Sequence, residues 1–452
     1  MTKTRRDGFY MLLLGCAVFL LMGAALARTL SVPMVDFRVL YYPARCVLQH
    51  CDPYNEGEVL RIVQAEAGDI SLDSAKIRQI LAQFLYPPTI FSFTVPFALL
   101  SWGPAHILWM TFLIGGLIFA SFLIWNLGAD YSPTLSGILV GFLLANCELL
   151  AITGNGAGIA ISLCVVAVWC FFRGRFDWAG VLCLAVALAI KPHDTALVWL
   201  YFLLAGGVYR KRALQTLVAT FVFCMPAALW VWHVSPHWFQ ELHSNILAFS
   251  THGGMNDPGL ASSGAHGIGM LVSLQAVIGI FWDDPRIYNP ATYLVCAPLL
   301  LAWAVTTLRI RPTPANLWLG LAAIAALTML PVYHRQNDTK LLLLTVPACA
   351  MLWARRGFIG WLALLLTAAG FVLTGDLPWA VFLSLIHVLH LPTTGLYGVL
   401  LIGLQVLPAP LILLAMGIFY LWVYMRHNVL PVRSSGTVEP GMVLENSKEI
   451  SL

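Results

Sequence analysis

A polar stretch at residues 35–54 holds the first side chains of this chain that could do acid–base chemistry. Asp36 stands a few residues beyond a long apolar segment, and Arg38, Tyr41 and Tyr42 follow it within two helical turns. A carboxylate fixed at a membrane surface is suited to act as a general base on an acceptor hydroxyl group. The alternative is that Asp36 caps the helix that follows, a role that aspartate fills well.

A second group, Lys191-Pro192-His193-Asp194, lies between two apolar segments. Lys191 and His193 could bind a phosphate group, the lysine as a point charge and the histidine as a hydrogen-bond donor. The alternative is a lysine that snorkels to the membrane interface. Pro192 and Asp194 are expected to begin the next helix in either case.

The densest group of ionisable and amide side chains runs from Tyr333 to Lys340 and reads YHRQNDTK. A simple turn between two apolar helices needs no such density. Arg335 and Lys340 could hold an anionic leaving group, and His334 or Asp338 could transfer a proton or orient an acceptor. We predict that these side chains meet Asp36 and Lys191 around one cavity.

The short motifs of nucleotide-driven and hydrolytic enzymes are absent: the chain has no Walker A sequence, GxGxxG, HExxH or GxSxG. An activated lipid phosphate is therefore expected to supply the energy for a transfer reaction. No CxxC pair or His/Cys cluster indicates zinc. Cys46 and Cys51 share the first polar loop, where they could form a disulfide if the loop faces an oxidising compartment.

The composition is that of a polytopic, all-α membrane protein. Hydrophobic residues make up 60% of the 452 residues and charged residues 10%, and the mean hydropathy is +0.82. Apolar runs near the ~20 residues that cross a bilayer recur from end to end. Nothing resembles a nucleic-acid-binding surface.

The apolar pattern predicts a first helix at 9–30, a polar loop at 31–83 with a short amphipathic helix at 68–84, and shorter re-entrant or interfacial segments near 268–282 and 378–391. Twelve further apolar segments follow the loop: 84–101, 104–127, 133–150, 155–172, 177–190, 194–209, 213–232, 291–309, 314–332, 340–354, 357–374 and 397–425. One segment between 84 and 172 is expected not to cross fully, which leaves about 12 spans. The cluster Asn146, Glu148, Thr153 and Asn155, with Gly154 and Gly156, marks the expected break.

Basic clusters predict the orientation of the chain in a cell membrane. They place both termini in the cytoplasm and the 31–83 loop, the 191–194 turn and the 333–339 turn outside. We expect residues 1–428 to form one transmembrane domain and residues 429–452 to form a mobile cytoplasmic tail.

Several of these motifs, in this order, resemble the pattern of glycosyltransferase family 87. The motifs are DFRVLYYPA…CDPY after the first span, YPP at the second, RGRFDWAGVLCLAVALAIKPHDTALVWLYFLL, AFSTHGGMNDPG and YHRQNDTKLLLLTVPA. The resemblance covers roughly residues 9–425. The chain departs from the family pattern at Thr153-Gly154-Asn155 and at Ser262-Ser263-Gly264, and these departures concern the identity of the acceptor more than the type of reaction.

The resemblance implies a GT-C fold and an inverting transfer of a sugar, typically mannose, from a polyprenyl-phosphate donor to a glycolipid or glycan acceptor on the extracytoplasmic face. It implies a general base at Asp36. The expected donor-phosphate ligands are Lys191, His193, Arg335 and Lys340. The expected acceptor or sugar ligands are Arg38, Tyr41, Tyr42, His334 and Asp338. Cationic side chains could take the place of a metal, and a divalent ion shared by Asp36 and the phosphate is the alternative.

Two other functions compete with the transferase. A flippase of lipid-linked sugars, or a small-solute transporter, would carry polar groups along a continuous path through the bilayer. Apart from Glu148 and scattered amides the sequence does not supply such a path. A non-catalytic assembly partner would tolerate the loss of Asp36, Lys191 and Arg335 together.

Overall fold

The computed structural model describes residues 2–28, 33–66, 75–254, 256–259, 271–390 and 395–426. Within these ranges every regular element is a helix, and an isolated bridge between Leu271 and Arg335 is the one pairing of strand type. The all-α prediction is confirmed. The predicted tail at 429–452 lies outside the described residues.

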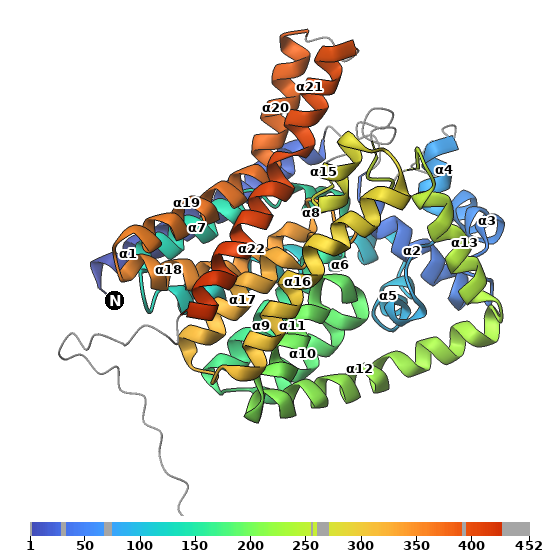
Figure 1. Cartoon of the computed structure of the whole chain (residues 1–452). Helices are drawn as coiled ribbons and strands as arrows, with labels where there is room; N and C mark the ends of the chain where they lie inside the picture. The colour runs from blue at the N-terminus through green and yellow to red at the C-terminus, as the bar shows by residue number, and fades with distance from the viewer. Residues whose placement is uncertain are drawn as a thin grey trace, which may run out of the picture.

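Six helices in the described ranges are long and apolar enough to cross a membrane (Figure 1). They are α1 (Lys3–Ala27), α6 (Trp102–Gly128), the broken helix Pro133–Thr153, α12 (Gly207–Val234), α16 (Pro285–Arg309) and the stretch Gly403–Arg426. A seventh span results if α19 (Phe358–Leu373) and α20 (Asp376–Val388), bent by 56° at their junction, cross together. The chain is therefore a multi-pass membrane protein.

The expected number of about 12 spans is not confirmed, because several apolar segments form short helices. α10 (Asp177–Ile190), α11 (Pro192–Ala205) and α17 (Pro314–Leu327) have 14 residues each. A helix of that length reaches only about 21 Å, less than the ~30 Å of hydrocarbon. The predicted segment 397–425 is divided between α21 (Gly395–Val406) and α22 (Pro408–Arg426).

The break expected between residues 84 and 172 lies where the polar cluster predicts it. α7 (Pro133–Leu144) and α8 (Glu148–Thr153) are separate helices, and α8 ends at Gly154 before α9 (Ala157–Arg173) begins. Gly154 has φ +69°, a left-handed conformation that favours glycine. A Cβ atom there would lie 2.7 Å from the Met34 side chain and 2.9 Å from that of Phe37.

Two helix breaks are joined by hydrogen bonds. The Leu149 N–H of α8 donates to Asp376 Oδ2 at 2.7 Å, and the Leu377 N–H of α20 donates to Asn146 Oδ1 at 3.1 Å. The α7–α8 break and the α19–α20 bend therefore satisfy each other's free peptide groups, as a membrane interior requires.

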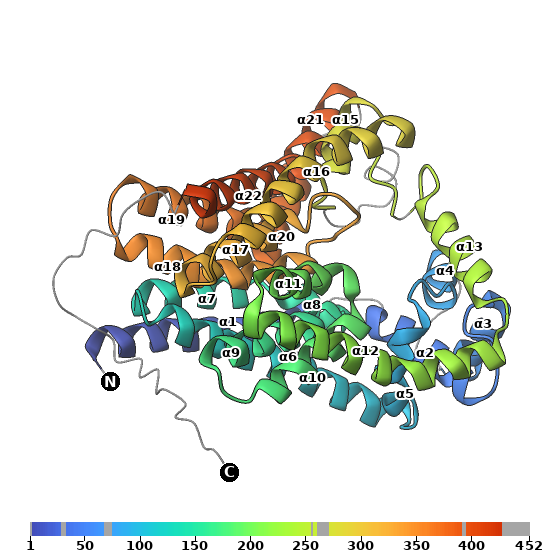
Figure 2. The same ribbon diagram turned by 60° about the horizontal axis from the view of Figure 1, so that its bottom comes forward.

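The first polar loop folds into α2 (Val35–Leu48), α3 (Glu56–Glu66) and α4 (Ala75–Ala82). α4 forms part of the predicted amphipathic helix, whose first residues lie outside the described ranges. A disulfide joins Cys46 to Cys51, with the two Cα atoms 5.0 Å apart. Figures 1 and 2 show α2, α3, α4 and α13 (Trp238–Ser250) together at one end of the molecule, away from α1 and α19.

Glycines let α1 cross α7 at close range. A Cβ atom added at Gly137 would collide with the Gly8 carbonyl, and one at Gly141 would lie 2.5 Å from the Met11 carbonyl oxygen. Small residues at such a contact are typical of helices that associate in a membrane. α1, which is largely exposed elsewhere, is therefore held by a narrow glycine-lined contact.

The buried centre is built on α17, whose residues from Asn316 to Leu327 are all buried. It packs on α22 and on the 3₁₀ helix η2 (Asp338–Thr345), which continues into α18 (Val346–Ala354). The remaining described helices are η1 (Pro88–Ile90), α5 (Phe91–Ala98) and α15 (Leu274–Phe281). The polar groups considered next lie at the ends of these buried helices.

Candidate active site

The turn between α10 and α11 holds Lys191 inside the protein. Lys191 Nζ donates a hydrogen bond to Asp338 Oδ1 and lies 3.5 Å from Asp194 Oδ2. The lysine is thus a buried ion-pair partner and does not snorkel. Pro192 occupies the first turn of α11 and Asp194 follows in that turn, as the sequence predicts.

Two imidazole rings flank Asp194. His193 Nε2 lies 3.5 Å and His334 Nε2 3.6 Å from Asp194 Oδ1. The side chains of Asp194 and His334 are fully buried, whereas that of His193 is 38% exposed. One ligating atom each from His193, Asp194, His334 and Asp338 lies within 4.8 Å of the others, so these four side chains could hold a metal ion.

The turn before η2 positions a cationic side chain beside this cluster. The Arg335 N–H donates to Asp338 Oδ2 at 2.9 Å, so the carboxylate that pairs with Lys191 also fixes the turn. The Arg335 guanidinium donates to the Tyr333 hydroxyl and, at 3.1 Å, to Asn256 Oδ1. Asn256 belongs to the AFSTHGGMNDPG stretch, which is thereby brought to the site.

Asp36 lies in the first turn of α2 but does not cap it. Met34 occupies the N-cap position, with no side-chain capping bond, and its N–H donates to the Ile152 carbonyl at 2.9 Å. Asp36 Oδ2 instead accepts a 2.8 Å hydrogen bond from Asn155 Nδ2. The side-chain oxygen Asn155 Oδ1 accepts a hydrogen bond from the Ala157 N–H at 2.9 Å, which fixes the orientation of the side-chain amide. A half-buried carboxylate is therefore held between α2 and the α8–α9 break.

The charges of Asp36, Lys191 and Asp338 act on the same neighbours. Burial raises the pKa of Tyr86, Lys191 lowers it, and Asp36 and Asp338 raise it. Burial lowers the pKa of Arg335, but Tyr333, Asp36 and Asp338 raise it above its ordinary value. A charge acts on the pKa of another group in this way only at short range. The Lys191–Asp338 ion pair joins the 191–194 turn to the 333–338 turn, and the direction of these pKa shifts indicates that Tyr86 and Asp36 of the first loop lie near them.

Two buried carboxylates share one lysine in this site. Burial alone would raise the pKa of Asp338, but the charge of Lys191 lowers it to about 2. Burial and the charge of Asp338 raise the pKa of Asp194 to about 8. Burial also lowers the pKa of His334. At neutral pH, Asp338 and Lys191 are therefore an ion pair, and Asp194 requires a further positive charge or a proton.

Lys340, a predicted phosphate ligand, lies in a different cluster. Its Nζ donates to Asp376 Oδ1 at 2.9 Å and to the Thr374 carbonyl at 3.3 Å, and the side chain is fully buried. The structure therefore places Lys340 at the junction of the two helix breaks and pairs it with an acid there.

Arg38, Tyr41 and Tyr42, which were predicted to bind the acceptor or the sugar, pack into a buried aromatic cluster. Arg38 lies over the Trp102 ring at 4.0 Å and donates to the Tyr42 hydroxyl at 3.0 Å. The Tyr41 hydroxyl donates to the Leu100 carbonyl at 2.9 Å. These contacts anchor α2, so the three side chains have structural partners of their own. Their predicted ligand roles stay untested.

Two site residues were not predicted as such from the sequence. Asn155 was noted only as part of the helix break, and Tyr86 only as the first residue of the YPP motif. Their roles depend on contacts that span more than 100 positions along the chain, as the 119 between Asn155 and Asp36 illustrates. Weak signals existed: both are polar side chains at ends of apolar segments.

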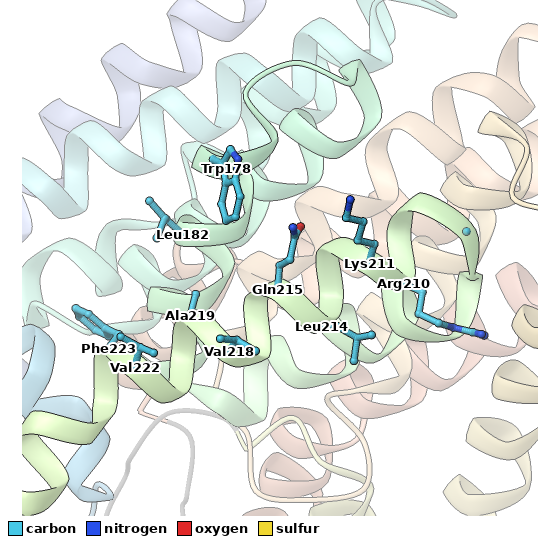
Figure 3. A pocket seen from close by; sticks show the side chains of 11 residues that line it. Trp178, Leu182, Arg210, Lys211, Leu214, Gln215, Val218, Ala219, Val222 and Phe223 are labelled. Atoms are coloured by element: carbon cyan, nitrogen blue, oxygen red, sulfur yellow. The ribbon is translucent and has the colours of Figure 1, made fainter. Parts of the chain in front are cut away.

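An open groove elsewhere lacks acid–base groups. It has a volume of about 870 Å³ and lies between α10 and α12 (Figure 3). Its lining is mainly apolar, with Arg210, Lys211 and Gln215 as its polar members. No carboxylate or imidazole occurs among the described residues that line it, so the candidate active site is the cluster around Tyr86.

The architecture and the site together define a helical membrane protein with reactive groups gathered at the ends of its helices. The model of glycosyltransferase family 87 matches residues 84–331, more than half of the chain, and the chain belongs to this family. It is therefore a membrane glycosyltransferase. No curated protein and no solved structure matches it. The matched range includes Lys191 and His193, while Asp36 and the 333–340 turn lie outside it.

Proposed function

We propose that this glycosyltransferase moves a hexose, mannose in the first instance, from a polyprenyl-phosphate donor to a hydroxyl group of a glycolipid or glycan. The observation that carries the proposal is the placement of Asp36, which Asn155 orients and whose charge raises the pKa of both Arg335 and Tyr86, as the charge of Asp338 also does. An acid and a cationic group around one position are what such a transfer needs.

The proposed reaction is a single displacement at the anomeric carbon. The acceptor oxygen forms a bond to C1 of the sugar while the bond from C1 to the phosphate oxygen breaks, so the configuration at C1 inverts. The acceptor proton passes to the Asp36 carboxylate, and polyprenyl phosphate leaves. A general base contributes typically 10²–10⁴-fold to such a step.

The leaving group gains negative charge as it departs, because a phosphodiester becomes a phosphate monoester. Preorganised cationic groups stabilise such developing charge. Arg335 is held for this purpose by Tyr333 and Asn256. Lys191 is already paired with Asp338, so its charge alone offers the phosphate less than the sequence suggested.

The site is proposed to open on the extracytoplasmic face of a cell membrane, with the polyprenyl chain in the bilayer. The first loop supports this orientation because its cysteines form a disulfide, a bond that persists in oxidising compartments. The basic clusters at the opposite helix ends agree with it.

A transporter of lipid-linked sugars is the second candidate, favoured by the buried Lys340–Asp376 pair. Intramembrane charges often mark a transport path. Here, however, the two charges neutralise each other, and each side chain also makes one hydrogen bond to the backbone of a broken helix. The pair therefore supports the helix breaks rather than a path.

The test is transfer by the purified, reconstituted protein, using labelled polyprenyl-phosphate mannose and a panel of glycolipid acceptors. We expect Asp36→Asn to lower kcat about 10²–10⁴-fold, because the amide cannot accept the proton. The matched control is Glu56→Gln, an exposed acid of the same loop, which should transfer at the wild-type rate.

Full transfer by Asp36→Asn would remove the proposed base. Movement of the intact lipid-linked sugar across the membrane without transfer would favour the transporter.

A further inference from the structure

Three side chains of the site present ligating atoms at the spacing of a metal centre. The Asp194 Oδ1 atom lies 3.5 Å from His193 Nε2 and 3.6 Å from His334 Nε2. Ligands at about 2.0–2.1 Å from a tetrahedral metal ion are separated by roughly 3.3 Å. The two observed separations exceed that value only slightly, and one ligating atom from each of the three side chains lies within 4.8 Å of the others.

The Asp194 and His334 atoms that would bind the ion have no hydrogen-bond partner within the described part of the chain, and Lys191 Nζ approaches Asp194 Oδ2 only to 3.5 Å. Neither Asp194 Oδ1 nor Oδ2 accepts a hydrogen bond, and His334 Nε2 has no hydrogen-bond partner, although both side chains are fully buried. A buried carboxylate without a donor is costly. A cation bound to Asp194 and His334 would relieve this cost.

The second ring nitrogen of His334 is already fixed. His334 Nδ1 lies 3.1 Å from the Val332 carbonyl oxygen, which can only accept a hydrogen bond. Nδ1 therefore carries the proton, and the lone pair is on Nε2, which lies 3.6 Å from Asp194 Oδ1. A backbone carbonyl that orients a histidine in this way is the usual outer contact of a metal-binding imidazole.

Asp338 belongs to the cluster but is already occupied. Lys191 binds its Oδ1 atom, and the Arg335 N–H binds Oδ2. Two histidines and one carboxylate thus remain as ligands and would leave coordination positions open. His193, which is 38% exposed, provides the side from which an ion and a ligand can enter.

The sum of the charges at the site also favours a bound cation. Lys191 offsets one of the two buried carboxylates, Asp194 and Asp338, and the second has no positive partner of its own. A phosphate group would meet no net positive charge there. A divalent cation would make the sum of these groups +1, which attracts a phosphate.

We propose that His193, Asp194 and His334 bind one divalent transition-metal ion, whose open positions accept the phosphate oxygens of the donor. The phosphate contact rests on the proposed transferase function, whereas the metal site rests on the three side chains alone. Imidazole and carboxylate together suit zinc and manganese ions.

Metal binding is tested without any sugar substrate. The full-length protein in detergent is treated with EDTA and dialysed against graded concentrations of Zn²⁺ or Mn²⁺, and bound metal is measured by elemental analysis. We expect one equivalent at the site in the wild type, and binding at least about tenfold weaker in Asp194→Asn and in His334→Gln. The controls are His243→Gln, an exposed histidine of α13, and His252→Gln, which belongs to a second His/Asp group.

His243→Gln and His252→Gln should both still bind the one metal ion per protein whose binding is weakened in His334→Gln. Thermal unfolding curves establish that each variant is folded, and the wild type should show a higher Tm with metal than with EDTA. Absence of binding by the wild type, or undiminished binding by both Asp194→Asn and His334→Gln, would overturn the metal site. Loss of the bound metal ion in His252→Gln, with binding retained in His334→Gln, would also overturn the proposed site and would place the ion at the His252 group.

The transferase and the metal site can fail separately. Transfer that proceeds at full rate in EDTA, by protein shown to be metal-free, would overturn the phosphate contact and leave the transferase intact. Metal binding as expected, with no transfer from any polyprenyl-phosphate sugar, would overturn the proposed function and leave the metal site.

Discussion

At the scale of single residues, the site is defined by ion-pair and hydrogen-bond partners that several side chains share. Lys191 is bound by Asp338 and approached by Asp194, while Asp338 also fixes the Arg335 backbone. A buried pair of this kind contributes little net stability, but the loss of one member leaves an uncompensated charge. The pair therefore offers a test of the site's electrostatics that needs no substrate.

Lys191→Met should destabilise the protein by about 3–5 kcal/mol, because it leaves the charged Asp338 carboxylate buried without its cation. The double variant Lys191→Met/Asp338→Asn should recover part of that loss, since one of the charges is then removed as well. Both variants should lack transfer activity. The free energy of unfolding is measured by denaturant titration in a fixed detergent.

The matched control is the ion pair between Arg173 and Asp130, whose side chains are 31% and 43% exposed. Arg173→Met should cost about 0–1 kcal/mol, as is usual for exposed pairs. A Lys191→Met variant as stable as Arg173→Met would show that the buried pair is not as the structure describes.

At the scale of helices, glycines and prolines determine how the site is assembled. Pro192 begins α11 directly after Lys191, and Gly154 ends α8 so that Asn155 can reach Asp36. Both features follow from the sequence, because proline is suited to the first turn of a helix and glycine to a left-handed end.

The α1–α7 contact can be tested by making the same substitution at a glycine inside the contact and at a glycine that faces open space. Gly141→Leu should lower Tm and the yield of folded protein, at a cost of roughly 1–3 kcal/mol or more, because its side chain would collide with the α1 backbone. Gly115→Leu in α6 should behave as the wild type, since a Cβ atom there meets nothing within 4 Å. Equal Tm values for the two variants would contradict the close crossing.

Partner choice among the polar residues could not be predicted from the sequence. Lys340 stands two positions after Asp338, yet the two side chains enter different clusters because η2 turns each toward another helix. Arg38 stands two positions after Asp36 and stacks on Trp102 instead of facing the site. The pattern of residue types located the polar regions correctly. Which side chains meet depends on tertiary packing.

At the scale of the whole molecule, the number of membrane spans also could not be predicted from the sequence. Hydropathy identified the apolar segments but could not tell a crossing helix from a short one, because both are equally apolar. The proposed orientation still depends on the distribution of charge and on the disulfide of the first loop.

Cysteine labelling in intact cells tests that orientation. Glu56→Cys in the first loop should react with a membrane-impermeant maleimide added outside. Arg175→Cys, between α9 and α10, should react only after the membrane is permeabilised. Both positions are exposed, so accessibility differs by side and not by burial. The reverse labelling pattern would place the site in the cytoplasm and exclude the proposed topology.

The mutual contacts between the two interrupted helices have a consequence for biosynthesis. Asn146 and Leu149 find their partners at Leu377 and Asp376, which are 231 and 227 positions further along the chain. During translation the earlier interruption is therefore inserted long before its partner leaves the ribosome. Its bare amide and carbonyl groups must be sheltered by water or by the insertion machinery until then, so this region cannot mature before α20 has been made.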